Sequence, residues 1–113
     1  MKKNIPLCIP NLTGNESKYL QNCIETTFVS SVGEYVNSFE EMLKKNTGYK
    51  YACAVSSGTT ALHLSLDAVG AKHDELVIVP TYSFIASANA VTHTGASPFF
   101  VDIDKETLNV DLD

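Results

Sequence analysis

The pattern of hydrophobic and polar positions changes near residue 50. Before it, apolar residues recur three or four positions apart in two stretches, which predicts one helix from residue 15 or 16 to about 27 and a second over residues 34–45. Residues 1–14 contain two prolines and a turn-forming Asn-Leu-Thr-Gly sequence, and they predict an extended arm. The first 50 residues are therefore expected to form an arm and two helices.

After residue 50, short apolar runs alternate with helical patterns. We expect strands over residues 51–55, 76–79 and 97–101, and helices from 59 to about 69 and from 82 or 83 to about 94. The uninterrupted run Leu-Val-Ile-Val before Pro80 is typical of a strand buried on both faces. A β-α-β-α-β order with short connections predicts an α/β fold with a mainly parallel sheet over residues 51–113.

Composition narrows the functional classes. The chain has 113 residues, 44% of them apolar and 19% charged, with a net charge of −5. All eight basic residues are lysines and they are scattered, so nucleic acid is not an expected partner. No apolar run approaches the length of a membrane span and no signal peptide is evident, so we expect a cytoplasmic protein. The three cysteines fit small buried hydrophobic positions in a reducing compartment.

The stretch from Ser56 to Thr60 is the strongest candidate for binding chemistry. It joins the expected strand to the following helix, and ligands of parallel sheets bind beyond the carboxyl ends of the strands. Gly58 permits close approach of an anion, and the N–H groups of Gly58, Thr59 and Thr60 would point at it from the positive end of the helix. The same residues are also typical of an ordinary Ser/Thr helix cap. Neither of the common nucleotide-binding glycine motifs is present.

Three other groups of residues are weaker candidates for a site. Phe84 follows the next strand and would either stack on a flat heterocycle or pack its helix against the sheet. Asp102 and Asp104 lie two apart at a strand exit, without further ligands to complete a metal site, so no metal is expected. The three histidines are isolated in the sequence and are interpreted as structural.

In order along the chain, several motifs resemble the start of the DegT/StrS family of pyridoxal-phosphate-dependent sugar-nucleotide aminotransferases. That resemblance implies the N-terminal part of a three-layer αβα large domain of the aspartate-aminotransferase fold. Within the family it is most similar to members that aminate UDP-linked 4-keto-6-deoxy sugars. The motifs are Ile5-Pro6-Leu7, Gly14-Asn15-Glu16, Val29-Ser30-Ser31-Val32-Gly33, Phe39-Glu40, Ser57-Gly58-Thr59-Thr60-Ala61-Leu62-His63, the run from Asp74 to Pro80 and the run from Gly95 to Asp104.

The resemblance assigns roles to individual residues. It implies that Gly58 and Thr59, with Ser57 and Thr60 beside them, bind the phosphate of pyridoxal 5'-phosphate, and that Phe84 stacks on its ring. Ser30 and Ser31 would lie near the substrate. One departure is Lys72-His73, where the family usually has a glycine, and we expect His73 to adopt the positive φ. The resemblance also implies a nucleotide-sugar substrate, an amino-acid donor such as glutamate, and a homodimer or higher oligomer.

The lysine that forms the Schiff base and the acidic partner of the pyridine nitrogen, which this chemistry requires, lie beyond residue 113 in the family. No catalytic residue is therefore expected here, and the chain is interpreted as an N-terminal fragment that is inactive alone. Three alternatives stay open at this point. They are the family's sugar dehydratases, a non-catalytic phosphate-binding or dimerisation module, and a flavodoxin-like carrier, which would not explain the arm and the first two helices.

Overall fold

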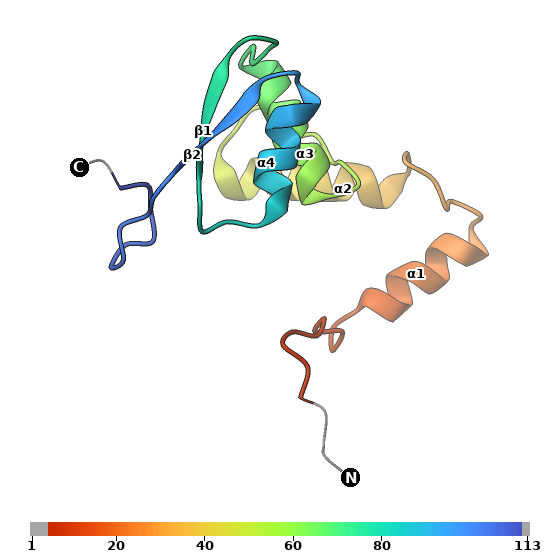
Figure 1. The fold of residues 1–113 in the computed structure, drawn as a ribbon. Coiled ribbons are helices and arrows are strands. Elements are labelled where there is room, and N and C mark those ends of the chain that lie inside the picture. The colour runs from red at the N-terminus through yellow and green to blue at the C-terminus, as the bar shows by residue number, and fades with distance from the viewer. Residues whose placement is uncertain (1–4, 112–113) are drawn as a thin grey trace. The chain divides into compact units, whose positions relative to one another are not determined.

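The computed structural model describes residues 5–111 as parts of two compact units, Met1–Ala54 and Val55–Asp113 (Figure 1). The elements follow the order α1 (Glu16–Glu25), α2 (Glu34–Thr47), α3 (Gly58–Ala68), β1 (Leu76–Pro80), α4 (Ile85–His93) and β2 (Ser97–Val101). Residues 5–13 form neither helix nor strand, as expected for the arm, while residues 1–4 lie outside the described part. All four predicted helices and two of the three predicted strands are confirmed.

The first unit is built on α1 and α2, whose predicted starts are confirmed. The helix α1 ends earlier than expected, because Thr26 donates its hydroxyl to Asn22 O at 2.7 Å and Thr27 turns to a positive φ of 62°. The helix α2 runs on to Thr47 and stops at Gly48, whose φ of 77° only glycine adopts without strain. The ring of Tyr35 lies 5.1 Å from that of Tyr19, so aromatic packing joins the two helices.

The expected strand over residues 51–55 is wrong, because these residues form no strand. The Ala54 N–H instead donates to Glu40 Oε1 on α2 at 2.8 Å. An apolar run predicts extended backbone, but a strand also needs a neighbour to complete its hydrogen-bond ladder. Among residues 5–111 the only paired strands are β1 and β2, and the run 51–55 has no ladder partner.

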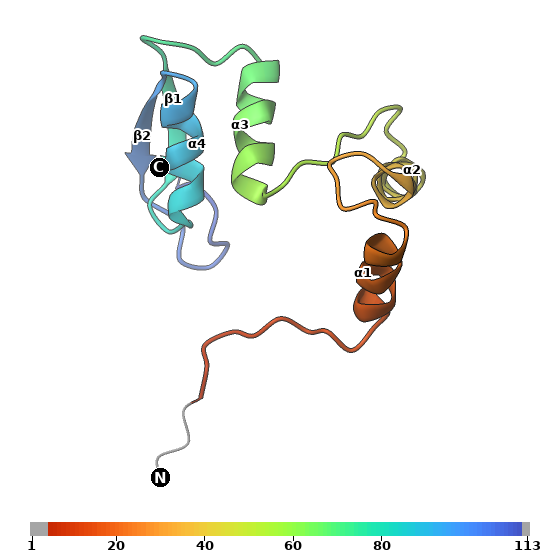
Figure 2. The same ribbon diagram turned by 90° about the vertical axis from the view of Figure 1, so that its right-hand side faces the viewer.

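The second unit contains the buried core. Strands β1 and β2 pair in parallel, with Leu76 opposite Ser97 and Pro80 opposite Val101, and α4 forms the connection between them. Figure 2 shows α4 next to the two strands and α3 beside α4. The core consists of Val79, Val91 and Ala96, together with Ala88 and Ala90 of α4, and Leu66 and Val77 pack against it.

The sheet is covered on one face only. Val79 is 4% exposed, whereas its neighbour Ile78 is 61% exposed and pairs with Phe99, which is 51% exposed. Alternate side chains of a strand point to opposite faces, so the covered face is the one on which Val79 lies. The prediction that this strand is buried on both faces is therefore wrong for the described residues. An apolar run shows that both faces favour burial, but not that both faces are covered.

The turn into β1 also differs from expectation. The residue with positive φ is Asp74, at 68°, and not His73. Aspartate tolerates this conformation better than most residues because its short side chain can hydrogen-bond locally. In the structure His73 Nδ1 lies 2.8 Å from Asp74 Oδ1.

Candidate functional site

The turn at the start of α3 is held by its own hydroxyl groups. Ser57 is the N-cap in an extended conformation, and its Oγ accepts a hydrogen bond from Thr60 N at 3.2 Å. The same Oγ lies 3.0 Å from Thr60 Oγ1. This arrangement satisfies one of the donors that every helix N-terminus leaves unpaired. Ser57 and Thr60 therefore stabilise the first turn.

Two amides remain available at this turn. The N–H groups of Gly58 and Thr59 donate no hydrogen bond within residues 5–111, whereas the Thr60 N–H is taken up by Ser57. The prediction that all three amides are free is therefore wrong for Thr60, because the serine cap competes with any ligand for that donor. The first turn of α3 also carries no acidic side chain, so no protein charge neutralises the positive end of the helix dipole.

These two residues open onto a groove between α3 and α4. Its volume is about 570 Å³, and its walls are Gly58, Thr59, Ala61, Leu62, Ser65, Phe84, Ala86 and Ser87. Phe84 is the N-cap of α4 and is 80% exposed, so its ring is not used to pack the helix against the sheet. Of the two interpretations of Phe84, exposure favours the one in which the ring is free for a ligand. The groove brings Gly58, Thr59 and Phe84 together, and leaves Ser57 and Thr60 outside its walls.

Sequence reasoning missed the serines that line the groove. Ser87 Oγ lies 2.9 Å from Ser83 Oγ, and Ser65 Oγ donates to Ala61 O at 2.8 Å. Ser65 lies seven residues after Gly58, which is two helical turns along the same face. That spacing could have placed Ser65 on the same helix face as Gly58. The sequence alone does not show that α4 lies beside this face, so it does not indicate a groove.

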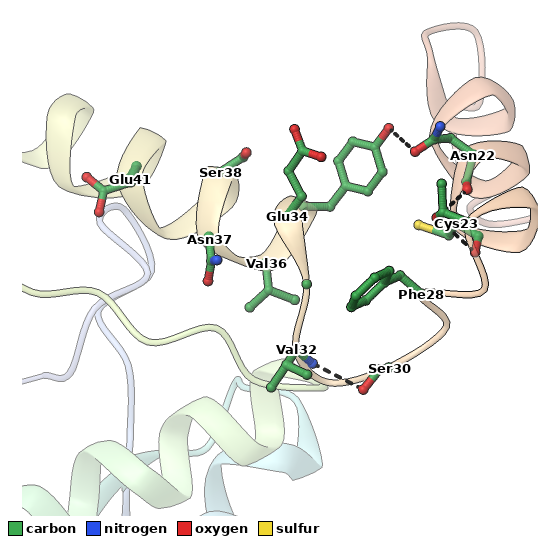
Figure 3. Close-up of a pocket in the computed structure, with 13 residues that line it drawn as sticks. Asn22, Cys23, Phe28, Ser30, Val32, Glu34, Val36, Asn37, Ser38 and Glu41 are labelled. Atoms are coloured by element: carbon green, nitrogen blue, oxygen red, sulfur yellow. Dashed lines mark hydrogen bonds between the residues drawn. The ribbon is translucent and has the colours of Figure 1, made fainter.

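Ser30 and Ser31 belong to the other unit. Ser30 lines a second cavity, of about 880 Å³, that lies between α1, the loop after it and the start of α2 (Figure 3). Its Oγ accepts a weak hydrogen bond from Val32 N at 3.4 Å. Ser31 is not among the lining residues, so of the two predicted substrate residues only Ser30 faces a cavity.

The carboxylates at the exit of β2 hold backbone. Asp102 Oδ1 accepts from Ile103 N at 2.9 Å, and Asp104 Oδ1 accepts from Thr107 N at 2.7 Å. Hydrogen bonds from the Thr107 side chain and backbone hold the pKa of Asp104 below its usual value of 3.8. Within residues 5–111, no group of three His, Cys, Asp or Glu side chains could hold a metal ion.

The histidines are not all isolated. His63 on α3 and His93 on α4 have ring centroids 5.4 Å apart, and His63 Nε2 lies 3.4 Å from Asp67 Oδ2. This pair joins the two helices that form the groove, which is consistent with a structural role.

No helix in the described part of the chain is long and apolar enough to cross a membrane.

Open amides at a helix N-terminus, an exposed aromatic ring beside the same groove and a parallel β-α-β unit are together typical of proteins that bind a flat, phosphorylated ligand. Comparison with known proteins agrees with this class. The chain belongs to the DegT/DnrJ/EryC1/StrS aminotransferase family, whose model matches residues 10–113.

Individual relatives are named as enzymes that act on sugars. The chain is 48% identical over 105 residues to the GDP-perosamine synthase of Escherichia coli O157:H7, and 47% identical over 107 residues to that of Caulobacter vibrioides. These matches cover 93% and 95% of this chain but only 29% of each relative. The chain therefore spans less than a third of the length of these relatives.

Solved structures show the same fold. The PLP-form of Spr1654 from Streptococcus pneumoniae matches 96% of this chain with a TM-score of 0.80 and 29% identity, and the match covers 28% of that protein. The Escherichia coli GDP-4-keto-6-deoxy-D-mannose-3-dehydratase with bound hydrated PLP matches 96% of this chain with a TM-score of 0.77 and 36% identity, covering 29% of that protein. The expected α/β fold, with its parallel sheet and helices, is confirmed as the N-terminal part of such structures.

Proposed function

We propose that the chain provides the phosphate-binding part of a pyridoxal-phosphate-dependent aminotransferase that acts on a nucleotide-linked 4-keto-6-deoxy sugar, with glutamate as the amino donor, for glycan biosynthesis. The observation that carries this proposal is the groove in which the open amides of Gly58 and Thr59 lie with the exposed ring of Phe84. Family membership and the GDP-perosamine synthase relatives support the reaction class.

The residues present fit the cofactor's two chemically distinct parts. A phosphate dianion suits two N–H donors at a helix N-terminus whose first turn carries no acidic side chain, and a pyridine ring suits an exposed phenyl ring. Ser57 and Thr60 stabilise the turn that presents these amides, because Ser57 Oγ accepts from the Thr60 amide and the two hydroxyl groups are within hydrogen-bond distance of one another. When bound, pyridoxal phosphate supplies an electron sink for moving an amino group. This chain's own residues anchor the phosphate, orient the ring and cover one of its faces.

The nucleotide is proposed to be GDP rather than UDP. The motif resemblance favoured UDP-linked substrates, but two relatives at 48% and 47% identity are named for GDP-perosamine. Three further proposals concern the organisation of the protein. Residues 1–50 form an N-terminal arm with two helices, and residues 51–113 form the first part of a cofactor-binding large domain. Ser30 and Ser31 lie near the sugar nucleotide, and the protein is a cytoplasmic homodimer. The exposed apolar face of the sheet at Ile78 and Phe99 supports association. The three cysteines are free, which suits a reducing compartment, but the expectation that they are buried is wrong, because Cys8 and Cys53 are exposed.

The test follows backbone amides of the 113-residue chain by nuclear magnetic resonance during titration with pyridoxal phosphate. We expect the resonances of Gly58 and Thr59 to shift most. The variant Gly58→Ala should weaken binding on the order of 10-fold, about the value of one hydrogen bond to a charged group. A Cβ at this position meets nothing within 4 Å, so the fold tolerates the methyl group and only the approach of the anion is obstructed.

A matched control is Thr92→Ala, near the other end of α4 from Phe84, which should bind as the unchanged chain does. Amide resonances of α3 that do not shift with pyridoxal phosphate, or equal affinity of pyridoxal phosphate for the unchanged chain and for Gly58→Ala, would contradict the proposal.

A dehydratase is the second candidate, favoured by the 36% identity to the Escherichia coli dehydratase. Because the chain is expected to be inactive alone, this test uses the full-length enzyme. Supplied with keto sugar and glutamate, it should yield an amino sugar in the first case and a 3-deoxy sugar in the second.

A further inference from the structure

Helix α4 begins at a residue whose side chain cannot cap it. Its N-cap is Phe84, which makes no side-chain cap hydrogen bond. Serine, threonine, aspartate and asparagine are the usual N-caps, because their oxygens accept from N–H groups of the first turn, whereas a phenyl ring offers no such acceptor. The ring of Phe84 is instead 80% exposed. The start of α4 therefore departs from the local preference at the residue that is proposed to stack on the cofactor.

Ser87 makes the bonds at the start of α4 that a phenyl ring cannot make. Its N–H donates to Phe84 O at 3.0 Å, and its Oγ lies 2.9 Å from Ser83 Oγ. Ser87 is the third residue of the helix, the position from which a side chain reaches back to the cap in a capping box. Ser87 is thus bonded both to Phe84 and to the residue before it.

These two bonds determine how the loop before α4 is held. The start of the loop is tied to the sheet, because Thr81 N donates to Val101 O at 2.9 Å. Residues 82–84 make no further hydrogen bond within the described part of the chain, apart from the two with Ser87. A ring that is mostly exposed is not oriented by packing against its neighbours. The place of the Phe84 ring at the groove therefore depends on its main chain, and through it on Ser87.

We propose that Ser87, through its bond to Ser83, is the positioning residue for the ring of Phe84. The hydroxyl pair replaces the missing helix cap, so the first turn is held while the ring stays free for a ligand. Phe84 and Ser87 both line the groove, whereas Ser83 is not among its walls. The inference rests on the proposed function for its ligand, pyridoxal phosphate, but the bond between Ser87 and Ser83 can be tested without any ligand.

The experiment compares Ser87→Ala and Ser83→Ala in the 113-residue chain. Each variant removes one half of the pair, so each should lower the affinity for pyridoxal phosphate about 2- to 5-fold, the lower part of what an aromatic contact contributes. Affinity for inorganic phosphate should stay unchanged. At saturation, the circular dichroism of bound pyridoxal phosphate in its own absorption band should weaken in both variants, because the ring beside it is held less firmly.

Two further variants serve as controls. Ser87→Thr keeps the hydroxyl group and should restore most of the affinity and of the circular dichroism. Thr92→Ala removes a hydroxyl from the same helix that bonds to Asn89 O outside the groove, and it should behave as the unchanged chain. In a Phe84→Leu background, Ser87→Ala should cause no additional loss of affinity, because its effect passes through the ring.

A ligand-free measurement tests the positioning separately. The backbone order parameter of Phe84 should fall from about 0.85, the value of rigid backbone, towards about 0.6 in Ser87→Ala and in Ser83→Ala. An unchanged order parameter in both variants, or equal losses of affinity for pyridoxal phosphate and inorganic phosphate, would overturn the inference. A loss of affinity in Ser87→Ala alone would also overturn it, because Ser87 would then contact the ligand directly.

The two proposals can fail independently. If the Gly58 and Thr59 amides of the unchanged chain do not shift with pyridoxal phosphate while the order parameter of Phe84 falls as expected, the proposed function is refuted and the positioning of Phe84 by Ser87 is supported. If those amides shift but the order parameter is the same in every variant, only the role of Ser87 is refuted.

Discussion

Two substitutions of Ser57 distinguish its contribution to the stability of the first turn of α3 from its effect on anion binding there. Ser57→Ala removes the acceptor that Thr60 N uses at 3.2 Å. Loss of a serine cap costs about 0.5–2 kcal/mol. The distance lies at the long end for such a hydrogen bond and the site is exposed, so water replaces part of it and we expect about 1 kcal/mol. Amide hydrogen exchange in the first turn of α3 should therefore accelerate about 5-fold.

Ser57→Asp makes the opposite combination. Aspartate caps helices as well as serine does, so exchange in the first turn should stay as it is in the unchanged chain. Its carboxylate, however, lies beside the amides that are proposed to bind phosphate. Two unit charges about 4 Å apart in water interact by roughly 1 kcal/mol, so affinity for pyridoxal phosphate should fall about 5-fold or more.

The two variants must therefore differ in kind. Ser57→Ala should lose local protection, and its Thr60 amide, now free, should begin to respond to phosphate. Ser57→Asp should keep protection and lose affinity. Unchanged exchange in Ser57→Ala would refute the capping role, and unchanged affinity in Ser57→Asp would refute a phosphate site at this turn.

Two further predictions concern Phe84 and Asp104. Phe84→Leu keeps an apolar side chain but removes the ring, so the binding free energy of pyridoxal phosphate should weaken by about 0.5–1.5 kcal/mol. Affinity for inorganic phosphate, measured by the same kind of titration, should stay unchanged. Equal losses for both ligands would contradict stacking. Asp104, whose pKa lies below 3.8, stabilises the fold above that value and loses the effect as pH falls through its lower folded pKa. In urea unfolding at pH 7, the free energy of unfolding of Asp104→Asn should therefore be lower than that of the unchanged chain. This difference should vanish in acid. A difference that is the same at both pH values would show that ionisation is not involved.

Local features of the fold were predictable because local interactions determine them. The start of α2 at Glu34 and its stop near Gly48 follow from helical spacing and glycine's left-handed conformation. The bounds of β2, Ser97–Val101, match the apolar run bounded by Gly95 and Asp102. Each of these signals is carried by residues that are neighbours in the chain.

The errors occurred where the answer depends on residues distant in sequence. The run 51–55 is apolar enough for a strand, but no ladder partner is present among residues 5–111. Ile78 looked like a core residue, but α4 covers only the face that carries Val79.

The candidate site shows the same limit. Gly58, Thr59 and Phe84 were identified in advance, the first two from turn chemistry and all three from family resemblance. A serine cap was given only as an alternative to the anion site. That the cap takes the Thr60 amide and leaves those of Gly58 and Thr59 open depends on a side-chain rotamer. The cavity of the first unit, which Ser30 lines, was missed for a different reason. Its lining residues come from two helices and a loop, and only the folded chain brings them together.

The division of the chain into two units has a practical consequence for spectroscopy. The chain has no tryptophan and five tyrosines, of which Tyr19, Tyr35, Tyr49 and Tyr51 belong to the first unit and only Tyr82 to the second. Tyrosine emission therefore reports mainly on the arm and its two helices. Melting of the groove between α3 and α4 would leave that signal almost unchanged. An unfolding curve recorded by tyrosine emission describes mainly the first unit, and the unit that contains the groove must be followed by its own amides.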